Sequence, residues 1–173
     1  AGSAIVVKWD KNGTRKWSKS YRSNAPNLDR IIGITETSDG GYLLVGTQNA
    51  AGYAANGLAI KLDMNGNAQW IKHYSYLEGA DILTVMEVED GFLVSGNYLF
   101  NTNTTYGVFV IKISKNDGSI LQTKSWKMPD NSIIYHSRLH KTNSGYYLAC
   151  NQLVAQLPNY FNNMRQIILH LDN

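Results

Sequence analysis

Cysteine and proline are both scarce in this chain of 173 residues, which contains one cysteine and three prolines. A lone cysteine, Cys150, excludes an internal disulfide framework and any zinc site built on cysteines. It lies in the apolar run 146–150, so we expect a small buried side chain. The sequence also lacks any run of about 18 apolar residues, which a membrane-spanning helix needs. We therefore expect no membrane insertion.

Charged residues are few as well, at 17% of the chain against roughly 25% in an average soluble protein. The net charge is +3, and the basic residues are spread along the chain instead of forming a run. Because a nucleic-acid-binding protein concentrates its basic residues on one stripe or face, we expect no nucleic-acid partner. Tyrosine and glycine are plentiful, with 11 and 15 residues. This composition favours strands joined by tight turns over helices.

An internal repeat of roughly 50 residues is the main pattern in the chain. An apolar run that ends in lysine places Lys8, Lys61 and Lys112 at equivalent positions, and His170 takes the same place in a fourth copy. Two other landmarks keep this phase: the Gly-aromatic runs 41–46, 91–96 and 145–150, and the Trp-x-Lys-x-Tyr runs 17–21 and 70–74. In the third copy Gln122 replaces the tryptophan. Several landmarks in one register indicate successive copies of one structural unit.

Each unit predicts four short antiparallel strands, which we term A to D. The A strands are expected at 31–37, 82–88 and 133–141, and each D strand alternates with period two. Asn-Gly and Asp-Gly pairs between C and D predict type I′ hairpin turns. No connection offers the helical crossover that a parallel sheet needs. We predict an all-β protein of β-propeller-type blades in one domain, 1–173, with units at about 4–28 (C and D), 29–76, 77–127 and 128–173 (A, B and C).

The segments 37–46 and 60–74 carry the motifs Asp-Gly-Gly-Tyr, Ile-Lys-x-Asp-x-Asn-Gly and Trp-x-Lys-x-Tyr, with small departures. This pattern resembles a family of exported bacterial and archaeal repeat proteins that form β-propellers. The third unit departs from it at Ser114 and Gln122, and the last unit lacks Asp-Gly-Gly. The resemblance implies a propeller fold and an extracellular, cell-surface or periplasmic location, but it assigns no single activity.

The chain holds about three blades, whereas propellers close with roughly 4–8. Unpaired blades would leave open sheet edges, which promote aggregation. Two alternatives stay open at this point. Either the chain is a segment of a larger propeller, or two copies join as a homodimer into one ring.

The long B–C and D–A connections differ from unit to unit, and we expect the face that they form to be the binding surface, while the A–B and C–D turns are short and similar. In an antiparallel meander these two groups lie at opposite ends of the blades. Function often resides on variable loops held by a rigid scaffold, and aromatic residues there provide rigid contact area. The B–C loops 47–57, 97–107 and 151–165 carry the aromatic residues that we expect to bind a glycan or a protein: Tyr53, Tyr98, Phe100, Tyr106, Tyr160 and Phe161. Ordinary solvated loops are the alternative.

Recurring residues outside the loops predict structural roles. We expect Trp17 and Trp70 to pack between blades, because both occupy one phase of the repeat. The recurring lysines are expected to contact the acids that begin the A strands, Asp29 and Asp81. The Asp-x-Asn-Gly segments at 10–13 and 63–66 lack the further oxygen ligands of a calcium loop, so we expect turns, with no metal or cofactor.

Three titratable residues suggest a catalytic alternative. Counting back from the turn glycines places Glu36 and His140 at equivalent positions, with Glu87 close to them after a one-residue gap. If these three side chains lined a central channel, they would suit the acid–base chemistry of a hydrolase or lyase that acts on polysaccharide. We expect them instead to be solvated strand-end residues. The favoured function is a non-catalytic binding or scaffolding module, and a purely structural spacer is the third alternative.

Overall fold

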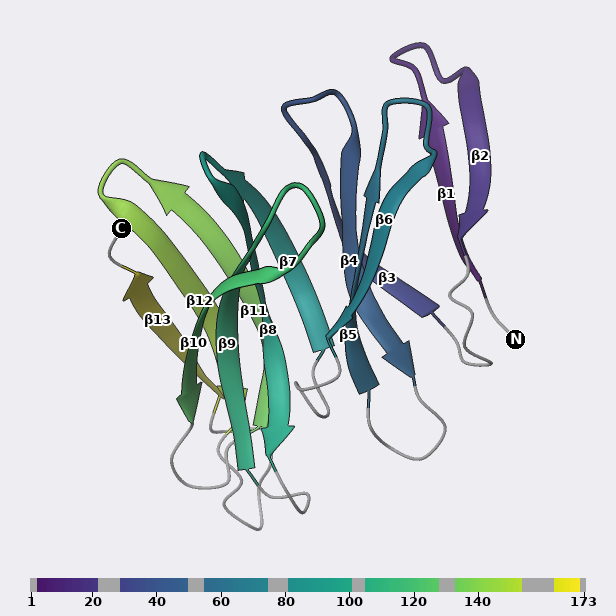
Figure 1. Cartoon of the computed structure of the whole chain (residues 1–173). Coiled ribbons are helices and arrows are strands. Elements are labelled where there is room, and N and C mark those ends of the chain that lie inside the picture. Colours follow the sequence, from purple (N-terminus) through teal and green to yellow (C-terminus); the bar gives the residue numbers. More distant parts are fainter. Residues whose placement is uncertain are drawn as a thin grey trace.

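A computed structural model describes residues 3–21, 29–49, 55–74, 81–100, 105–127, 133–153 and 164–171. These residues form thirteen strands in four antiparallel sheets (Figure 1). The described part contains no helix, and so none suited to crossing a membrane. The all-β prediction and the predicted grouping of the strands are confirmed.

The sheets follow one another in chain order, and within each sheet consecutive strands are neighbours. Sheet 1 contains β1 (Ala4–Trp9) and β2 (Arg15–Tyr21). Sheet 2 contains β3 (Asp29–Glu36), β4 (Tyr42–Asn49), β5 (Ala55–Leu62) and β6 (Ala68–Tyr74). Sheet 3 contains β7 (Asp81–Val88), β8 (Gly91–Phe100), β9 (Thr105–Ile113) and β10 (Ile120–Lys127). Sheet 4 contains β11 (Ile133–Thr142), β12 (Gly145–Leu153) and β13 (Met164–Leu171).

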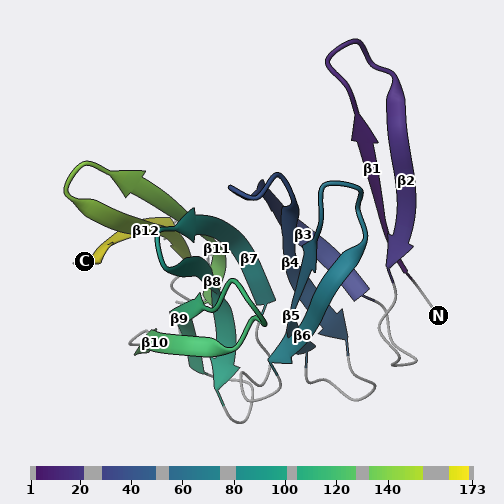
Figure 2. The same ribbon diagram turned by 45° about the horizontal axis from the view of Figure 1, so that its top comes forward.

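Sheets 1 to 4 succeed one another across the molecule, with sheet 1 and sheet 4 at opposite ends (Figures 1 and 2). A separate cluster of buried apolar side chains lies between each pair of neighbouring sheets. Strand β4 illustrates the arrangement, because Leu43 and Val45 contribute to the cluster with sheet 3 while Leu44 faces sheet 1. Successive side chains of a strand point to opposite faces, so a strand buried on both faces needs a continuous apolar run. This need explains the uninterrupted runs in the B and C strands.

The same contacts join sheet 1 to sheet 2 and sheet 2 to sheet 3. The hydroxyl of Tyr21 donates to the carbonyl oxygen of Gly66 at 2.6 Å, and that of Tyr74 donates to the carbonyl oxygen of Gly118 at 2.9 Å. The ring of Trp17 lies against Gly66, where a Cβ would be 3.0 Å from it. Trp70 lies likewise against Gly118, and its Nε1 donates to the carbonyl of Lys115 at 3.1 Å. The predicted packing role of both tryptophans is confirmed.

The C–D turns differ from the predicted type I′ geometry. In the first, the amide of Gly13 donates to the carbonyl of Asp10 at 3.0 Å, and the amide of Asp10 donates to the carbonyl of Thr14 at 2.9 Å. Gly13 has a φ of 79°, so the turn ends in a left-handed glycine, as in a longer hairpin loop. The carboxylate of Asp10 stabilises this geometry because it accepts hydrogen bonds from the backbone amides of Asn12 and Thr14, both at 2.9 Å. The turn at 63–67 repeats these bonds.

The hairpins between the B and C strands are longer than predicted. Pairing of β4 with β5 continues to Asn49 and Ala55, and pairing of β8 with β9 continues to Phe100 and Thr105. The connecting loops are therefore shorter than the predicted loops 47–57 and 97–107. Antiparallel pairing extends into sequence that reads as loop because cross-strand hydrogen bonds form without regard to side-chain pattern.

Candidate functional site

The structure describes the six aromatic residues predicted for the loop surface only in part. Tyr53, Tyr160 and Phe161 lie outside the described residues. Phe100 ends β8 and Tyr106 lies near the start of β9, and their side chains are outside the described part. Both positions belong to the end of sheet 3 from which the B–C connection leaves.

Tyr98 is the exception, because it lies in the core and not on an exposed surface. Its side chain is 7% exposed and belongs to the cluster between sheets 2 and 3. Its ring centroid is 6.3 Å from that of Phe109, and burial raises the pKa of its hydroxyl. The extension of β8 causes this difference, since the alternation of the strand turns Tyr98 inward.

The strand register confirms the equivalence of Glu36 and Glu87 and corrects that of His140. Glu36 pairs with Tyr42 and Glu87 pairs with Phe92, so both stand opposite the first aromatic residue of a B strand. In sheet 4 the residue opposite Tyr146 is Lys141, whereas His140 pairs with Tyr147. Four residues separate the paired residues in sheets 3 and 4, against five in sheet 2, so counting back from the glycines in sheet 4 is wrong by one residue.

Glu87 acts as a link between two sheets. Its carboxylate accepts hydrogen bonds from the backbone amide and the hydroxyl of Ser38 in the A–B turn of sheet 2, both at 2.7 Å. It also forms an ion pair with Lys115 at 2.7 Å. Burial acts to raise the pKa of Glu87, but the bonds from Lys115 and Ser38 outweigh it and lower the pKa. A carboxylate held in the charged form in this way suits a structural contact and does not suit a proton donor.

Lys61 and Lys112 pair with different acids from those predicted. Lys61 is 3% exposed, and its Nζ donates to Asp39 in the A–B turn of its own sheet at 2.8 and 3.0 Å. It also donates to the carbonyl of Leu62 at 3.0 Å and to Oε1 of Gln69 at 3.1 Å. Hydrogen bonds from Lys61, then from Thr37, lower the pKa of Asp39 to about 2. Asp81 instead accepts a hydrogen bond from Thr47 at 2.8 Å.

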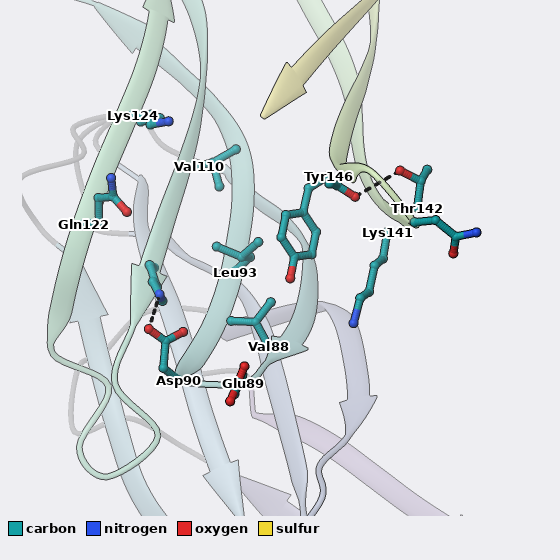
Figure 3. A pocket seen from close by; sticks show the side chains of 13 residues that line it. Val88, Glu89, Asp90, Leu93, Val110, Gln122, Lys124, Lys141, Thr142 and Tyr146 are labelled. Atoms are coloured by element: carbon teal, nitrogen blue, oxygen red, sulfur yellow. Dashed lines mark hydrogen bonds and ion pairs between the residues drawn. The ribbon is translucent and has the colours of Figure 1, made fainter. Parts of the chain in front are cut away.

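A cavity of about 550 Å³ lies between sheets 3 and 4, at the end that carries the tight turns. Val88, Leu93 and Val110 line it from sheet 3, and Tyr146 projects toward them from sheet 4 (Figure 3). Polar side chains surround this apolar floor: Glu89, Asp90, Lys112, Gln122, Lys124, Lys141, Thr142 and Asn143. The cavity therefore combines one aromatic side chain with a polar rim of three lysines, two acidic residues and three neutral residues.

The repeat explains why the cavity forms here. The corresponding space between sheets 2 and 3 is smaller, at about 390 Å³, and Trp70 lines it. Between sheets 3 and 4 the equivalent residue is Gln122, which has no ring to place beside Tyr146. Between sheets 1 and 2 a tryptophan does take this place: the ring of Trp17 makes an edge contact with the ring of Tyr42, and the two ring centroids are 6.1 Å apart. The departure at Gln122 was visible in the sequence, and it was the signal for this cavity.

The charges around the cavity favour a polar ligand with a negative group. Lys112 forms an ion pair with Asp90, which lowers the pKa of that carboxyl group. Lys124 and Lys141 have no ion-pair partner among the described residues, and they flank the space from sheets 3 and 4 (Figure 3). The ammonium groups of Lys124 and Lys141 outnumber the remaining carboxylate, that of Glu89, so the rim of the cavity carries an excess of positive charge.

The described residues give little support for metal binding or thiol chemistry. No group of three or more His, Cys, Asp or Glu side chains there is arranged to hold a metal ion. Cys150 is 2% exposed in the core between sheets 3 and 4, and burial raises the pKa of its thiol to about 11. The prediction of a small buried side chain is confirmed.

These features define an all-β protein of successive antiparallel sheets with an inter-sheet cavity. A scan against protein-family models found no match for the sequence. A search of curated proteins found no match either.

Proposed function

We propose that the four sheets are successive blades of a β-propeller. The observation that supports this arrangement is the repeated contact between neighbouring sheets, in which a D-strand tyrosine hydroxyl bonds to the turn glycine of the next sheet. Four-stranded antiparallel sheets packed face to face are the units from which propellers are built. Repeating one contact with one geometry rotates each sheet by a similar amount relative to the last.

The function that we propose is a non-catalytic binding or scaffolding module of an exported or cell-surface protein. The bonds of Glu87 to Ser38 and Lys115 support this choice over a hydrolase or lyase, since they commit its carboxylate to joining sheets. The exported location rests on the family resemblance of the blade motifs. The ligand that we propose is a glycan or another protein.

Two surfaces at opposite ends of the sheets compete as the binding site. The first is the end where the strand pairs β4–β5 and β8–β9 lead into variable, Tyr- and Asn-rich segments (Figure 1). The second is the cavity beside Gln122 at the tight-turn end. We propose the variable end as the main surface because its sequence differs between units while the turns are nearly constant, as expected where a scaffold presents specificity.

A binding screen with two sets of variants tests this proposal. The wild-type chain is screened on a glycan array and as bait for extracellular protein fractions, with each hit verified by titration. We expect Tyr106→Ala and Tyr160→Ala to weaken the titrated affinity at least tenfold, and Gln122→Trp, which fills the cavity, to leave it unchanged. The reverse result would move the site to the cavity. A wild-type chain without any titratable ligand would overturn the binding function in favour of a spacer.

A further inference from the structure

One face of sheet 1 exposes a row of large apolar side chains. Ile5, Val7 and Trp9 on β1 are 70%, 38% and 58% exposed. The residues between them face the other way, where Val6 packs against sheet 2 and the ammonium group of Lys8 lies 5.2 Å from the ring centroid of Tyr42. Three neighbouring apolar side chains on one strand face form a patch of the kind that marks an interaction site.

The repeat shows what covers this position elsewhere in the molecule. The equivalent residues are Leu58, Ile60 and Leu62 on β5, and Phe109, Ile111 and Ile113 on β9, and none is more than 2% exposed. On β5 they pack in the cluster that contains Tyr21 of sheet 1. On β9 they pack in the cluster that contains Tyr74 of sheet 2. In both sheets the covering element is therefore the preceding sheet.

The opposite end of the molecule presents the complementary face. Leu43 and Val45 on β4 are fully buried because they pack in the cluster with the following sheet. The equivalent residues of sheet 4 are Tyr147 and Ala149 on β12, which are only half-buried. Between them, Leu148 is 0% exposed against sheet 3. The outward face of sheet 4 is therefore equivalent to the face of sheet 2 that packs against sheet 3.

We infer that the exposed face of sheet 1 binds sheet 4 of a second copy of this chain. The contact continues the interface that already joins sheet 1 to sheet 2 and sheet 2 to sheet 3. Because the two faces lie at opposite ends of one molecule, they meet between copies (Figure 1). Two copies joined head to tail at both ends form a closed ring with four sheets from each chain. Such a ring lies within the roughly 4–8 blades of known propellers.

The inference rests on the propeller arrangement and is independent of the ligand proposed above. Its first test is the mass of the wild-type chain, measured by size-exclusion chromatography with light scattering at micromolar concentration. We expect twice the chain mass of 19.3 kDa. We expect Ile5→Lys to give the single-chain mass. A wild-type monomer would overturn the inference without affecting the outcome of the ligand screen.

A matched control separates this face from general surface effects. Leu121 on β10 is 54% exposed and has the same side-chain volume as isoleucine. We expect Leu121→Lys to keep the dimer mass. If Leu121→Lys dissociates the dimer as fully as Ile5→Lys does, the patch on β1 is not the interface.

Mixing two variants tests the head-to-tail geometry. Ile5→Lys removes the sheet 1 face, and Ala149→Lys removes the sheet 4 face, so each variant alone should be a monomer. A mixture retains one intact pair of faces, and we expect it to form a heterodimer. A symmetric contact between two sheet 1 faces predicts no heterodimer, and that result would overturn the proposal. Near-UV circular dichroism checks that Ala149→Lys is folded, and Tyr147→Glu provides a second variant of the same face.

Discussion

At the scale of single residues, Lys61 shows how a charged side chain becomes part of the core. Its stem is buried beside Trp70, and its ammonium group reaches four oxygen atoms of Asp39, Leu62 and Gln69. A buried charge is stable only when its hydrogen-bonding capacity is used, and here three acceptor groups use it. The lysine thus ties the A–B turn to the C and D strands of the same sheet.

Replacing this lysine should measure the value of that link. We expect Lys61→Met to lower the free energy of unfolding by about 1–3 kcal/mol, because the acceptors lose their donor. Urea unfolding at neutral pH measures this change. Lys112→Met is the matched control at the equivalent position, where the ion pair with Asp90 is much more exposed. Its loss should be clearly smaller, and equal losses would contradict the importance of burial.

The partner of Lys61 predicts a pH dependence. The pKa of Asp39 is about 2 in the folded chain, below its ordinary value of 3.8. A carboxyl group with a lowered folded pKa contributes stability above its unfolded pKa and loses that contribution as the pH falls toward its folded pKa. We expect the stability difference between wild type and Asp39→Asn to be full above about pH 4 and to shrink toward about pH 2. Urea midpoints across this range measure it, and a constant difference would contradict the assignment.

At the scale of elements, the C–D turns hold two kinds of glycine. Gly13 and Gly118 both have positive φ, at 79° and 68°. A Cβ at Gly13 would meet nothing within 4 Å, whereas a Cβ at Gly118 would lie 2.7 Å from the ring of Trp70. Glycine is therefore needed at the first position for its backbone alone, and at the second position also for packing between sheets.

Alanine substitutions should separate these two requirements. Left-handed backbone costs an L-residue about 1–2 kcal/mol, and we expect Gly13→Ala to destabilise by this amount. Gly118→Ala should cost more, because the ring of Trp70 must move. Thermal and urea unfolding of both variants measure the difference. In the Trp70→Phe background the extra cost of Gly118→Ala should decrease, and additive effects would show that the ring is not responsible.

The sequence predicted these elements well, for identifiable reasons. Strand positions followed from the period-two alternation of runs such as 17–21 and from the phase shared by Lys8, Lys61 and Lys112. The Asn-Gly pair by itself predicts the wrong turn type, because the carboxylate of Asp10 bonds to the amides of Asn12 and Thr14. Tyr98 was misplaced because nothing in its neighbourhood marks the point where cross-strand pairing stops.

At the scale of the whole molecule, stability should vary from sheet to sheet. A stack in which each sheet contacts only its neighbours resembles a repeat protein, whose stability is a sum of unit and interface contributions. Sheets 2 and 3 are covered on both faces, whereas sheet 1 has two strands and exposes Ile5 and Trp9. A two-stranded sheet covered on one face is only marginally stable by itself.

Hydrogen exchange followed by mass spectrometry should reveal this gradient. We expect the amides of β4, β5, β8 and β9 to exchange slowest and those of β1 and β2 to exchange fastest at a protein concentration that favours single chains. At higher concentration, protection of β1 should rise if its outer face becomes covered. Uniform exchange across all sheets would contradict independent local opening and would indicate one cooperative unit.

The sequence by itself determined the all-β class, the grouping of the strands and the packing role of Trp17 and Trp70. These features depend on the local alternation of apolar and polar residues and on a repeat that is visible in the amino-acid sequence. Only the tertiary structure decided which acids Lys61 and Lys112 contact and that Lys141 stands where His140 was expected. The sequence marked the departure at Gln122, but only the structure showed the cavity beside Tyr146. The first two depend on turn length and the cavity depends on packing between neighbouring sheets, and no local pattern encodes either of these.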